Sequence, residues 1–325
     1  MTPENDIARQ SLCIFDPGYK LLSSQPRPEF MLIGSAKCGT TSFSSYLPLH
    51  PQVKPCVPKE PNFWSWRSCT RDQYQQLFVN ATPAISPGPT QQIGGEYSTS
   101  SLLHPLVPRR VRARLPDVKI IVLLRNPIDR AYSHFIMAQR NGGEPDCSFE
   151  EIVEREIEEI PELLAAHRRG FLDANFRTSA HRCHADGSLL NIASHRGDNA
   201  CYSLSSEQDL FRFYVTSYVF RSIYYDQLRR WLELFPREQI LILDSERLLQ
   251  QREDVMREAV AFLGLQSYDF GVDSLQHTWG GGANKHNTPG DYLPISASAR
   301  TRLSDFFAPH NKKLFDLIGE SYEWE

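Results

Sequence analysis

The sequence predicts an α/β fold in which a mostly parallel central sheet is flanked by helices. Two segments carry this prediction, because each joins an apolar run to a helix start through a polar turn. The first run is Phe30 to Ile33, and the second is Lys119 to Leu124. Continuous apolar runs of this length are typical of strands buried on both faces, as in parallel sheets. We therefore expect one large domain over residues 28–325, after an irregular arm over residues 1–27.

A phosphate-binding turn is predicted directly after the first strand. Gly34 and Gly39 allow close backbone approach, and the hydroxyl residues 40–42 can begin a helix while facing an anion. Their spacing matches the G-x-x-x-x-G-K-[ST] loop of nucleotide-binding proteins with one change. Thr40 stands where the lysine is expected, and Lys37 lies inside the loop. The alternative is an ordinary turn with a surface lysine.

A second polar junction follows the second strand. Arg125 comes directly after the strand, at the carboxyl end where ligands bind in open α/β sheets. Pro127 suits the first turn of a helix, and Ser133 lies about two turns further on. An arginine fork and a helix hydroxyl can together hold a terminal phosphate. The alternative is that Arg125 pairs with Asp129 or a neighbouring carboxylate and that Ser133 is a small packing residue.

The rest of the chain predicts further helices and one more strand. Residues 149–170 form a charged helical pattern, and residues 171–205 form a long insertion that we expect to line an acceptor cleft. An amphipathic helix is predicted over residues 211–235. A strand follows over residues 239–244, with a helix beginning near Glu246. Residues 296–318 are expected to form a helical tail that docks on the domain through Leu303, Phe306, Phe307, Leu314 and Leu317.

The two junctions together resemble motifs of sulfotransferases that use 3′-phosphoadenosine 5′-phosphosulfate (PAPS). The first resembles their 5′-phosphosulfate loop, and the second resembles their L-R-[ND]-P-x-[DE]-R-[AL]-x-S motif for the 3′-phosphate. The resemblance extends from Pro28 to Trp324 and is closest to Golgi-type enzymes that sulfate glycosaminoglycans. It implies a P-loop-kinase-like sulfotransferase fold and release of 3′-phosphoadenosine 5′-phosphate (PAP). The residues that it implies for nucleotide binding are Lys37, Cys38, Gly39, Thr40, Thr41, Ser42, Arg125, Ser133 and Lys285.

The resemblance also implies the residues that act on the acceptor. The segment from Lys59 to Trp64 resembles a K-E-x-x-F-[FW] segment whose glutamate is the catalytic base. A carboxylate within hydrogen-bond reach can take the proton of a sugar hydroxyl, which assigns that role to Glu60. Lys37 is implied to stabilise charge on the leaving phosphate. The alternative for Glu60 is a solvated charge on a loop.

Two further segments match the family in part. Glu96 falls where heparan-type enzymes carry E-K-[ST]-x-x-Y, although Tyr97 replaces the lysine. Glu96 is therefore expected to bind the acceptor or assist the base, and the alternative is a structural carboxylate. The glycine-rich segment 279–290 resembles the loop that closes over the nucleotide, with Lys285 touching phosphate. A plain surface linker is the alternative there.

Cysteines and hydropathy leave the compartment open. Cys56–Cys69 and Cys183–Cys201 are candidate disulfides in a luminal protein and would be reduced in the cytosol, while Cys38 is the candidate free thiol. Asn80 begins a glycosylation sequon. No apolar run approaches the roughly 20 residues of a membrane helix, and no hydrophobic secretion signal is present. We expect either a Golgi luminal domain whose membrane anchor is absent from this chain or a cytoplasmic enzyme.

The sequence therefore predicts transfer of a sulfuryl group from PAPS to a hydroxyl of a carbohydrate, expected to be a glycosaminoglycan such as chondroitin or heparan sulfate. No metal is expected, because no Cys/His spacing suits zinc and no carboxylate is placed to hold magnesium. No nucleic-acid partner is expected. The alternatives are a soluble sulfotransferase for a small alcohol, phenol or amine, and a non-catalytic nucleotide-binding module. A kinase is disfavoured, because Thr40 replaces its lysine.

Overall fold

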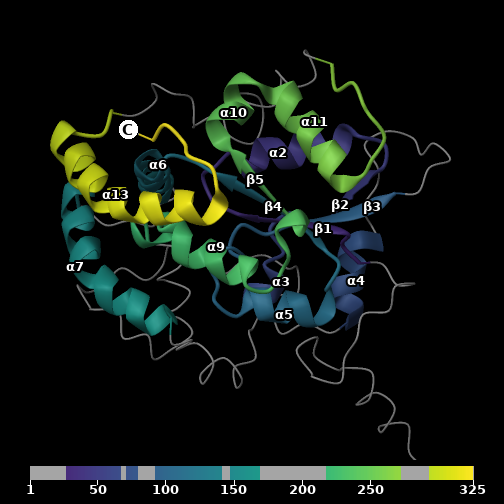
Figure 1. The fold of residues 1–325 in the computed structure, drawn as a ribbon, viewed down its shortest axis with the longest axis horizontal. Coiled ribbons are helices and arrows are strands. Elements are labelled where there is room, and N and C mark those ends of the chain that lie inside the picture. The colour runs from purple at the N-terminus through teal and green to yellow at the C-terminus, as the bar shows by residue number, and fades with distance from the viewer. Residues whose placement is uncertain are drawn as a thin grey trace, which may run out of the picture. The chain divides into compact units, whose positions relative to one another are not determined.

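The computed structural model describes residues 27–66, 71–79, 92–140, 147–168, 217–271 and 293–324 (Figure 1). The chain forms two compact units. The first unit comprises residues 1–124 and 232–285, and the second comprises residues 125–231 and 286–325.

The first unit contains a five-stranded sheet with the strand order β2-β3-β1-β4-β5. All four neighbouring pairs are parallel. The strands are β1 (Phe30–Gly34), β2 (Val53–Pro55), β3 (Ile93–Tyr97), β4 (Lys119–Leu124) and β5 (Ile240–Asp244). The central strand β1 is buried along its whole length, as the apolar run predicts. The predicted α/β fold with a parallel sheet is confirmed.

Helices lie on both sides of this sheet (Figure 1). One side carries α2 (Thr40–Tyr46), α10 (Ser245–Gln250) and α11 (Arg252–Leu263), and the other carries α3 (Phe63–Trp66), α4 (Arg71–Val79) and α5 (Val107–Arg114). Short 3₁₀ turns occupy η1 (Leu47–Leu49) and η4 (Arg237–Gln239). The helix predicted near Glu246 begins at Ser245, because the Asp244 carboxylate accepts the backbone N–H of Glu246 and caps it.

The second unit is helical in the residues that the structure describes. It contains α6 (Pro127–Arg140), α7 (Phe149–Arg168), η3 (Phe220–Ser222), α9 (Tyr224–Leu232) and α13 (Ala297–Ile318). The predicted helices over 149–170 and 296–318 are thus confirmed. Ser296 caps α13 through its hydroxyl, and Gly319 ends the helix with a left-handed φ of 74°. Leu303, Phe307 and Leu314 of α13 are buried, whereas Phe306 and Leu317 are half-buried.

The amphipathic helix predicted over residues 211–235 is confirmed over α9, residues 224–232, and is wrong for the described residues that precede α9. Helical structure there is limited to the 3₁₀ turn η3 and to α9, and residues 211–216 lie outside the described ranges. The Glu156 carboxylate, buried on α7, accepts the backbone N–H groups of three consecutive residues at 2.7, 2.8 and 3.1 Å. Because these N–H groups of Tyr218, Val219 and Phe220 bond to a side chain, they cannot continue an upstream helix.

A buried arginine completes this core of the second unit. Arg130 on α6 is fully buried, and its guanidinium donates to the Ser222 hydroxyl at 2.6 Å and to the carbonyl of Tyr218. Burial raises the pKa of Glu156 to about 7, although its three backbone hydrogen bonds and the Arg130 charge act in the opposite direction. Through their hydrogen bonds, Arg130 and Glu156 connect α6 and α7 to the turn over residues 218–222.

Several sequence predictions fall outside the described ranges. These are the insertion 171–205, the loop 279–290 with Lys285, the sequon at Asn80, and Cys13, Cys69, Cys183 and Cys201. The candidate Cys56–Cys69 disulfide is not formed in this structure. Cys56 is a buried free thiol that donates to the Pro58 carbonyl at 3.6 Å. Among the described helices, none is both long and apolar enough to span a membrane.

Candidate active site

The predicted phosphate loop lies between β1 and α2. The backbone of Lys37 has φ 72° and that of Gly39 has φ 78°, so both residues are left-handed and together reverse the chain before α2 begins. The Ser35 N–H donates to the Leu123 carbonyl at 2.8 Å and fixes the start of the loop against β4. Within the loop the Cys38 side chain is buried, whereas Thr41 and Ser42 are half-buried on α2.

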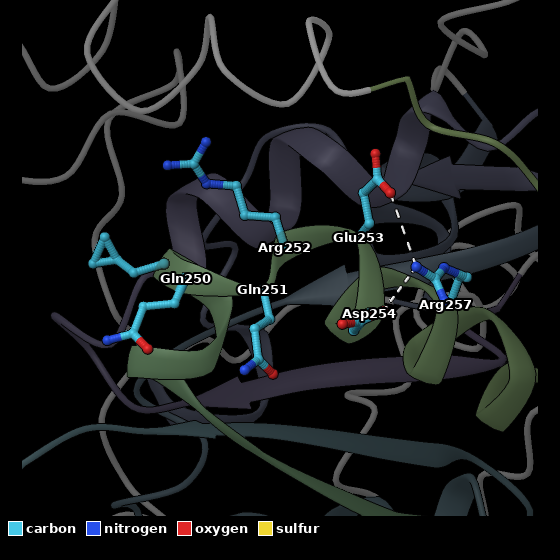
Figure 2. Close-up of a pocket in the computed structure, with 7 residues that line it drawn as sticks. Gln250, Gln251, Arg252, Glu253, Asp254 and Arg257 are labelled. Atoms are coloured by element: carbon cyan, nitrogen blue, oxygen red, sulfur yellow. Dashed lines mark ion pairs between the residues drawn. The ribbon is translucent and has the colours of Figure 1, made fainter.

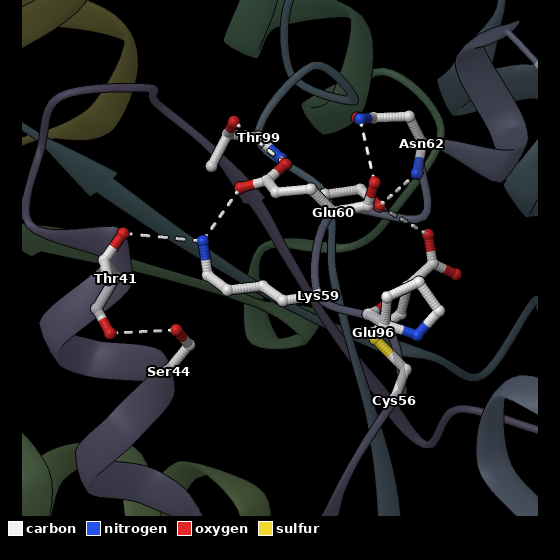
Figure 3. Close-up of polar contacts among 10 residues, drawn as sticks. Thr41, Ser44, Cys56, Lys59, Glu60, Asn62, Glu96 and Thr99 are labelled. Atoms are coloured by element: carbon white, nitrogen blue, oxygen red, sulfur yellow. Dashed lines mark hydrogen bonds and ion pairs between the residues drawn. The ribbon is translucent and has the colours of Figure 1, made fainter. Parts of the chain in front are cut away.

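The segment that carries Glu60 follows β2 and docks on the end of β3. The Glu60 N–H donates to the Tyr97 carbonyl at 2.9 Å, and the Asn62 N–H donates to the Ser98 hydroxyl at 3.1 Å. The Asn62 amide also donates to the Glu60 carbonyl at 3.0 Å. These bonds hold the backbone of residues 60–62 in a fixed turn at the carboxyl end of the sheet (Figure 3).

The Glu60 carboxylate has a different partner on each oxygen. Its Oε2 accepts from the backbone N–H of Thr99 at 2.8 Å and from the Thr99 hydroxyl at 3.1 Å. Its Oε1 accepts from the Lys59 ammonium at 3.1 Å, and the same ammonium lies 3.5 Å from the Thr41 hydroxyl. Figure 3 shows Lys59 extending between Glu60 and Thr41. The structure thus links the predicted base to the helix that follows the predicted phosphate loop.

Backbone strain is concentrated on these residues. Within the described ranges, the non-glycine residues with positive φ are Lys37, Glu60 at 58° and Asn62 at 49°. Such conformations cost about 1–3 kcal/mol each and persist where the surrounding structure fixes them, commonly at functional sites. Two of the three are the residues predicted to act in catalysis, and the third bonds directly to one of them. The strain therefore favours a functional role for this loop and this segment.

Glu96 occupies a closed polar network under the Glu60 segment. It is fully buried on β3, where Oε2 accepts from the Tyr74 hydroxyl at 2.7 Å and from the Trp64 indole at 2.9 Å. Its Oε1 accepts from the Ser98 hydroxyl at 3.0 Å. The same hydroxyl accepts the Asn62 N–H, so Glu96 supports the turn that carries Glu60. This geometry favours the structural alternative for Glu96 over direct contact with an acceptor.

The Glu96 network predicts a specific pH dependence of stability. Burial raises the pKa of Glu96 from 4.5 to about 7, while its hydrogen bonds lower it and the nearby Glu60 charge raises it further. Between about pH 4.5 and pH 7, Glu96 is protonated in the folded protein and ionised in the unfolded chain. The free energy of unfolding therefore falls as the pH rises through this range. Glu96→Gln should flatten that decrease.

Urea unfolding at about pH 5 and about pH 8 measures this effect. Gln can keep the network, because its carbonyl accepts from Trp64 and Tyr74 while its amide donates to the Ser98 hydroxyl. Some pH dependence should remain, because burial also raises the pKa of Glu156 to about 7. An unchanged pH dependence in the variant would contradict a buried, titrating Glu96.

The residues predicted to hold a 3′-phosphate lie in the second unit. Arg125 precedes α6, and the hydroxyl of Tyr224 donates to its carbonyl at 3.0 Å. Asn126 caps α6 by accepting the Ile128 N–H at 2.9 Å. Ser133 is buried on α6. Asp129, one partner considered for Arg125, pairs with Arg300 at 2.6 Å. The phosphate-binding role of Arg125 and Ser133 stays a prediction.

One surface hollow of the described residues lies outside the predicted site. A surface hollow between α10 and α11 is lined by residues 249–254 and Arg257, none of which was predicted to act (Figure 2). Arg257 there pairs with Asp254 at 2.7 Å. Within the described ranges no cluster of three or more His, Cys, Asp or Glu side chains is arranged to hold a metal ion.

Sequence reasoning missed four participants in the site. They are Lys59, which the motif does not assign a role, and Thr99, Ser98 and Tyr74, which no motif includes. Thr99 lies 39 residues from Glu60 and Tyr74 lies 22 residues from Glu96, so no local pattern relates them. The one available signal was the hydroxyl-rich stretch that follows Tyr97 at the end of a predicted strand.

Comparison with known proteins gives a consistent result. Residues 27–298 match the family profile described as "Sulfotransferase domain". The chain is 27% identical to the membrane-associated sulfotransferase kil1 of Dictyostelium discoideum over 92% of this chain and 66% of that protein. It is 26% identical to the bifunctional heparan sulfate N-deacetylase/N-sulfotransferase 2 of Bos taurus over 90% of this chain and 29% of that protein.

Two further comparisons extend this pattern. Carbohydrate sulfotransferase 15 of Rattus norvegicus is 24% identical over 92% of this chain and 54% of that protein. The chain thus spans less than two thirds of the length of these curated relatives. A crystal structure of a sulfotransferase from Alicyclobacillus acidocaldarius superposes with a TM-score of 0.60 and 24% identity, covering 91% of this chain and 97% of that chain. That similarity supports the fold.

Proposed function

Because the chain belongs to the sulfotransferase domain family, we propose that it is an enzyme that transfers a sulfuryl group from PAPS to a hydroxyl of a carbohydrate. The observation that carries this proposal is the Glu60 carboxylate, held at the carboxyl end of the sheet and linked through Lys59 to the helix after the phosphate loop. The names of the relatives, which include a heparan sulfate N-sulfotransferase and a carbohydrate sulfotransferase, support a glycan acceptor.

The proposed reaction is a displacement at sulfur. The acceptor oxygen forms a bond to sulfur while the bond between sulfur and the bridging oxygen of the 5′-phosphate breaks. The electron pair of that bond goes to the phosphate oxygen, and PAP leaves. The acceptor proton passes to Glu60. Oε1 is the oxygen best placed to receive it, because Oε2 is already held by two donors from Thr99.

Lys37 and the loop around it are proposed to stabilise the charge that develops on the leaving phosphate. The left-handed backbone at Lys37 and Gly39 places both residues within the turn between β1 and α2. Cys38, Thr40, Thr41 and Ser42 complete the proposed 5′ part of the nucleotide site, and Lys285 is proposed to contact phosphate. Arg125 and Ser133 are proposed to hold the 3′-phosphate.

This assignment predicts strong discrimination between two nucleotides. PAP should bind far more tightly than AMP, because AMP lacks the 3′-phosphate that Arg125 and Ser133 are proposed to hold. Losing a charge-assisted contact costs about 1.5–3 kcal/mol, or roughly tenfold to more than a hundredfold in affinity. Isothermal calorimetry with both nucleotides measures the difference. Equal affinities would remove the 3′-phosphate assignment.

The acceptor is tested by incubating the protein with ³⁵S-labelled PAPS and a panel of acceptors. We expect label in a glycosaminoglycan such as chondroitin or heparan sulfate. Label only in small alcohols, phenols or amines would support the alternative small-molecule enzyme. PAP binding with no labelled product from any acceptor would favour a nucleotide-binding module.

The compartment follows from the acceptor. For a glycan acceptor we propose the Golgi lumen as the site of the reaction, and the name of the kil1 relative, which associates that protein with a membrane, supports this proposal. Fractionation of the native protein tests this location, and recovery with cytoplasmic markers would contradict it.

A further inference from the structure

The side chain of Lys59 connects two parts of the site that the proposed mechanism treats separately. Its ammonium lies 3.1 Å from Glu60 Oε1 and 3.5 Å from the hydroxyl of Thr41, the second residue of α2. The side chains of Lys59 and Glu60 are 35% and 28% exposed. Lys59 is therefore a partly solvated cation that contacts the predicted base on one side and the helix after the phosphate loop on the other (Figure 3).

The two oxygens of the Glu60 carboxylate differ in how firmly their hydrogen-bond donors are held. Thr99 holds Oε2 with a backbone N–H and a hydroxyl, and the backbone of Glu60 is itself bonded to β3. Oε1 is held by a long and flexible lysine side chain. A partly exposed ion pair of this kind is weak, so another anion can compete for the ammonium. A change of partner by Lys59 requires rotation of its own side chain and no movement of Glu60.

We propose that Lys59 exchanges between Glu60 and the anionic 5′ group of the bound nucleotide, so that donor binding uncovers the oxygen that accepts the acceptor proton. This inference rests on the proposed function. Its consequence is an order of events: with the 5′ group absent, the ammonium covers Oε1, and with the 5′ group bound, Oε1 becomes available. Lys59 is thus a second cation of the transfer site, distinct from Lys37, and a positioning residue for the base.

The exchange makes Glu60 a competitor of the nucleotide for Lys59, which calorimetry can detect without any turnover. The probes are PAP and adenosine 3′-monophosphate, which lacks the 5′ group. Lys59→Gln should weaken PAP binding by about fivefold to tenfold, as expected for a partly exposed charge-assisted contact, and should leave adenosine 3′-monophosphate unchanged. Glu60→Gln should strengthen PAP binding by about twofold to fivefold, because the competing carboxylate charge is gone.

A double variant and a charge control complete the experiment. In Lys59→Gln/Glu60→Gln the gain from the Glu60 change should disappear, since the two residues act through one contact. Lys54→Gln removes the same charge from β2, five residues earlier, and should leave PAP affinity unchanged. Equal losses for both nucleotides in Lys59→Gln, or a Glu60→Gln gain that survives without Lys59, would overturn the exchange.

The outcomes separate this inference from the proposed function. If the wild-type protein binds PAP and transfers sulfate while Lys59→Gln binds PAP normally, only the exchange is wrong. If the wild-type protein binds no PAP at all, the proposed function and the exchange are overturned together.

Discussion

Lys37→Ala is expected to abolish most sulfuryl transfer while the protein remains folded. Lys37 lies in the left-handed turn between β1 and α2, where its charge is proposed to face the phosphate that leaves with PAP. Removing one preorganised group that stabilises developing charge costs about 10²–10³ in turnover in comparable sites. Alanine has a Cβ as lysine does, so the positive φ of residue 37 is not made worse by the change.

Turnover with PAPS and thermal melting are the two measurements. Lys37→Arg is the matched variant that keeps the charge, and it should retain more activity than Lys37→Ala. Lys54→Gln removes a charge elsewhere in the same unit and controls for a general loss of positive potential. A Lys37→Ala protein that melts normally and turns over at near-normal rates would exclude Lys37 as the group that stabilises the leaving phosphate.

The parts of the fold that the sequence predicted well are those with strong local signals. β4 has the predicted bounds, and β1 extends the predicted run only to Gly34, because an uninterrupted apolar run is compatible with burial on both faces of a sheet. α6 begins at Pro127, where a fixed φ and a missing N–H suit the first helical turn. α13 begins after Ser296 because that hydroxyl caps it.

The helix prediction over residues 211–235 failed only in the residues described before α9, because of tertiary hydrogen bonds. The apolar spacing over residues 211–235 suits one amphipathic helix, but the Glu156 carboxylate takes the N–H groups of Tyr218, Val219 and Phe220. Glu156 lies more than 60 residues earlier in the chain, on α7. No periodicity in residues 211–235 reports such a partner.

The candidate site shows the same division between local and distant information. The residue types at Lys37 and Glu60 could be matched to motifs, but their left-handed backbones could not be read from the sequence. The contact of Lys59 with Thr41 joins residues 18 positions apart, and the contact of Glu60 with Thr99 joins residues 39 positions apart. Motif spacing thus predicted the chemistry of the candidate residues, whereas the hydrogen-bond network that positions them required the fold.

Glu60→Gln is expected to reduce turnover by about 10²–10⁴-fold, which is the usual contribution of a general base. The amide oxygen can still accept from the N–H and hydroxyl of Thr99, so the turn at residue 60 should keep its geometry. The amide cannot take the acceptor proton. Nucleotide affinity should not be weakened, because the substitution removes a negative charge and adds no steric bulk. Steady-state turnover at saturating PAPS, together with PAP binding, measures both quantities.

Glu96→Gln is the matched control for Glu60→Gln, because it makes the same change at the other carboxylate of the two motifs. Glu96 is fully buried and bonded to Trp64, Tyr74 and Ser98, so it has no exposed oxygen for an acceptor hydroxyl. Its conversion to glutamine should therefore alter the pH dependence of stability and leave most of the turnover intact. If Glu96→Gln were inactive and Glu60→Gln active, the buried carboxylate would have to be the base, and the site would have to open to expose it. If both variants retained activity, the proton acceptor would lie outside these two segments, and the position of Glu60 at the end of the sheet would serve binding instead of proton transfer.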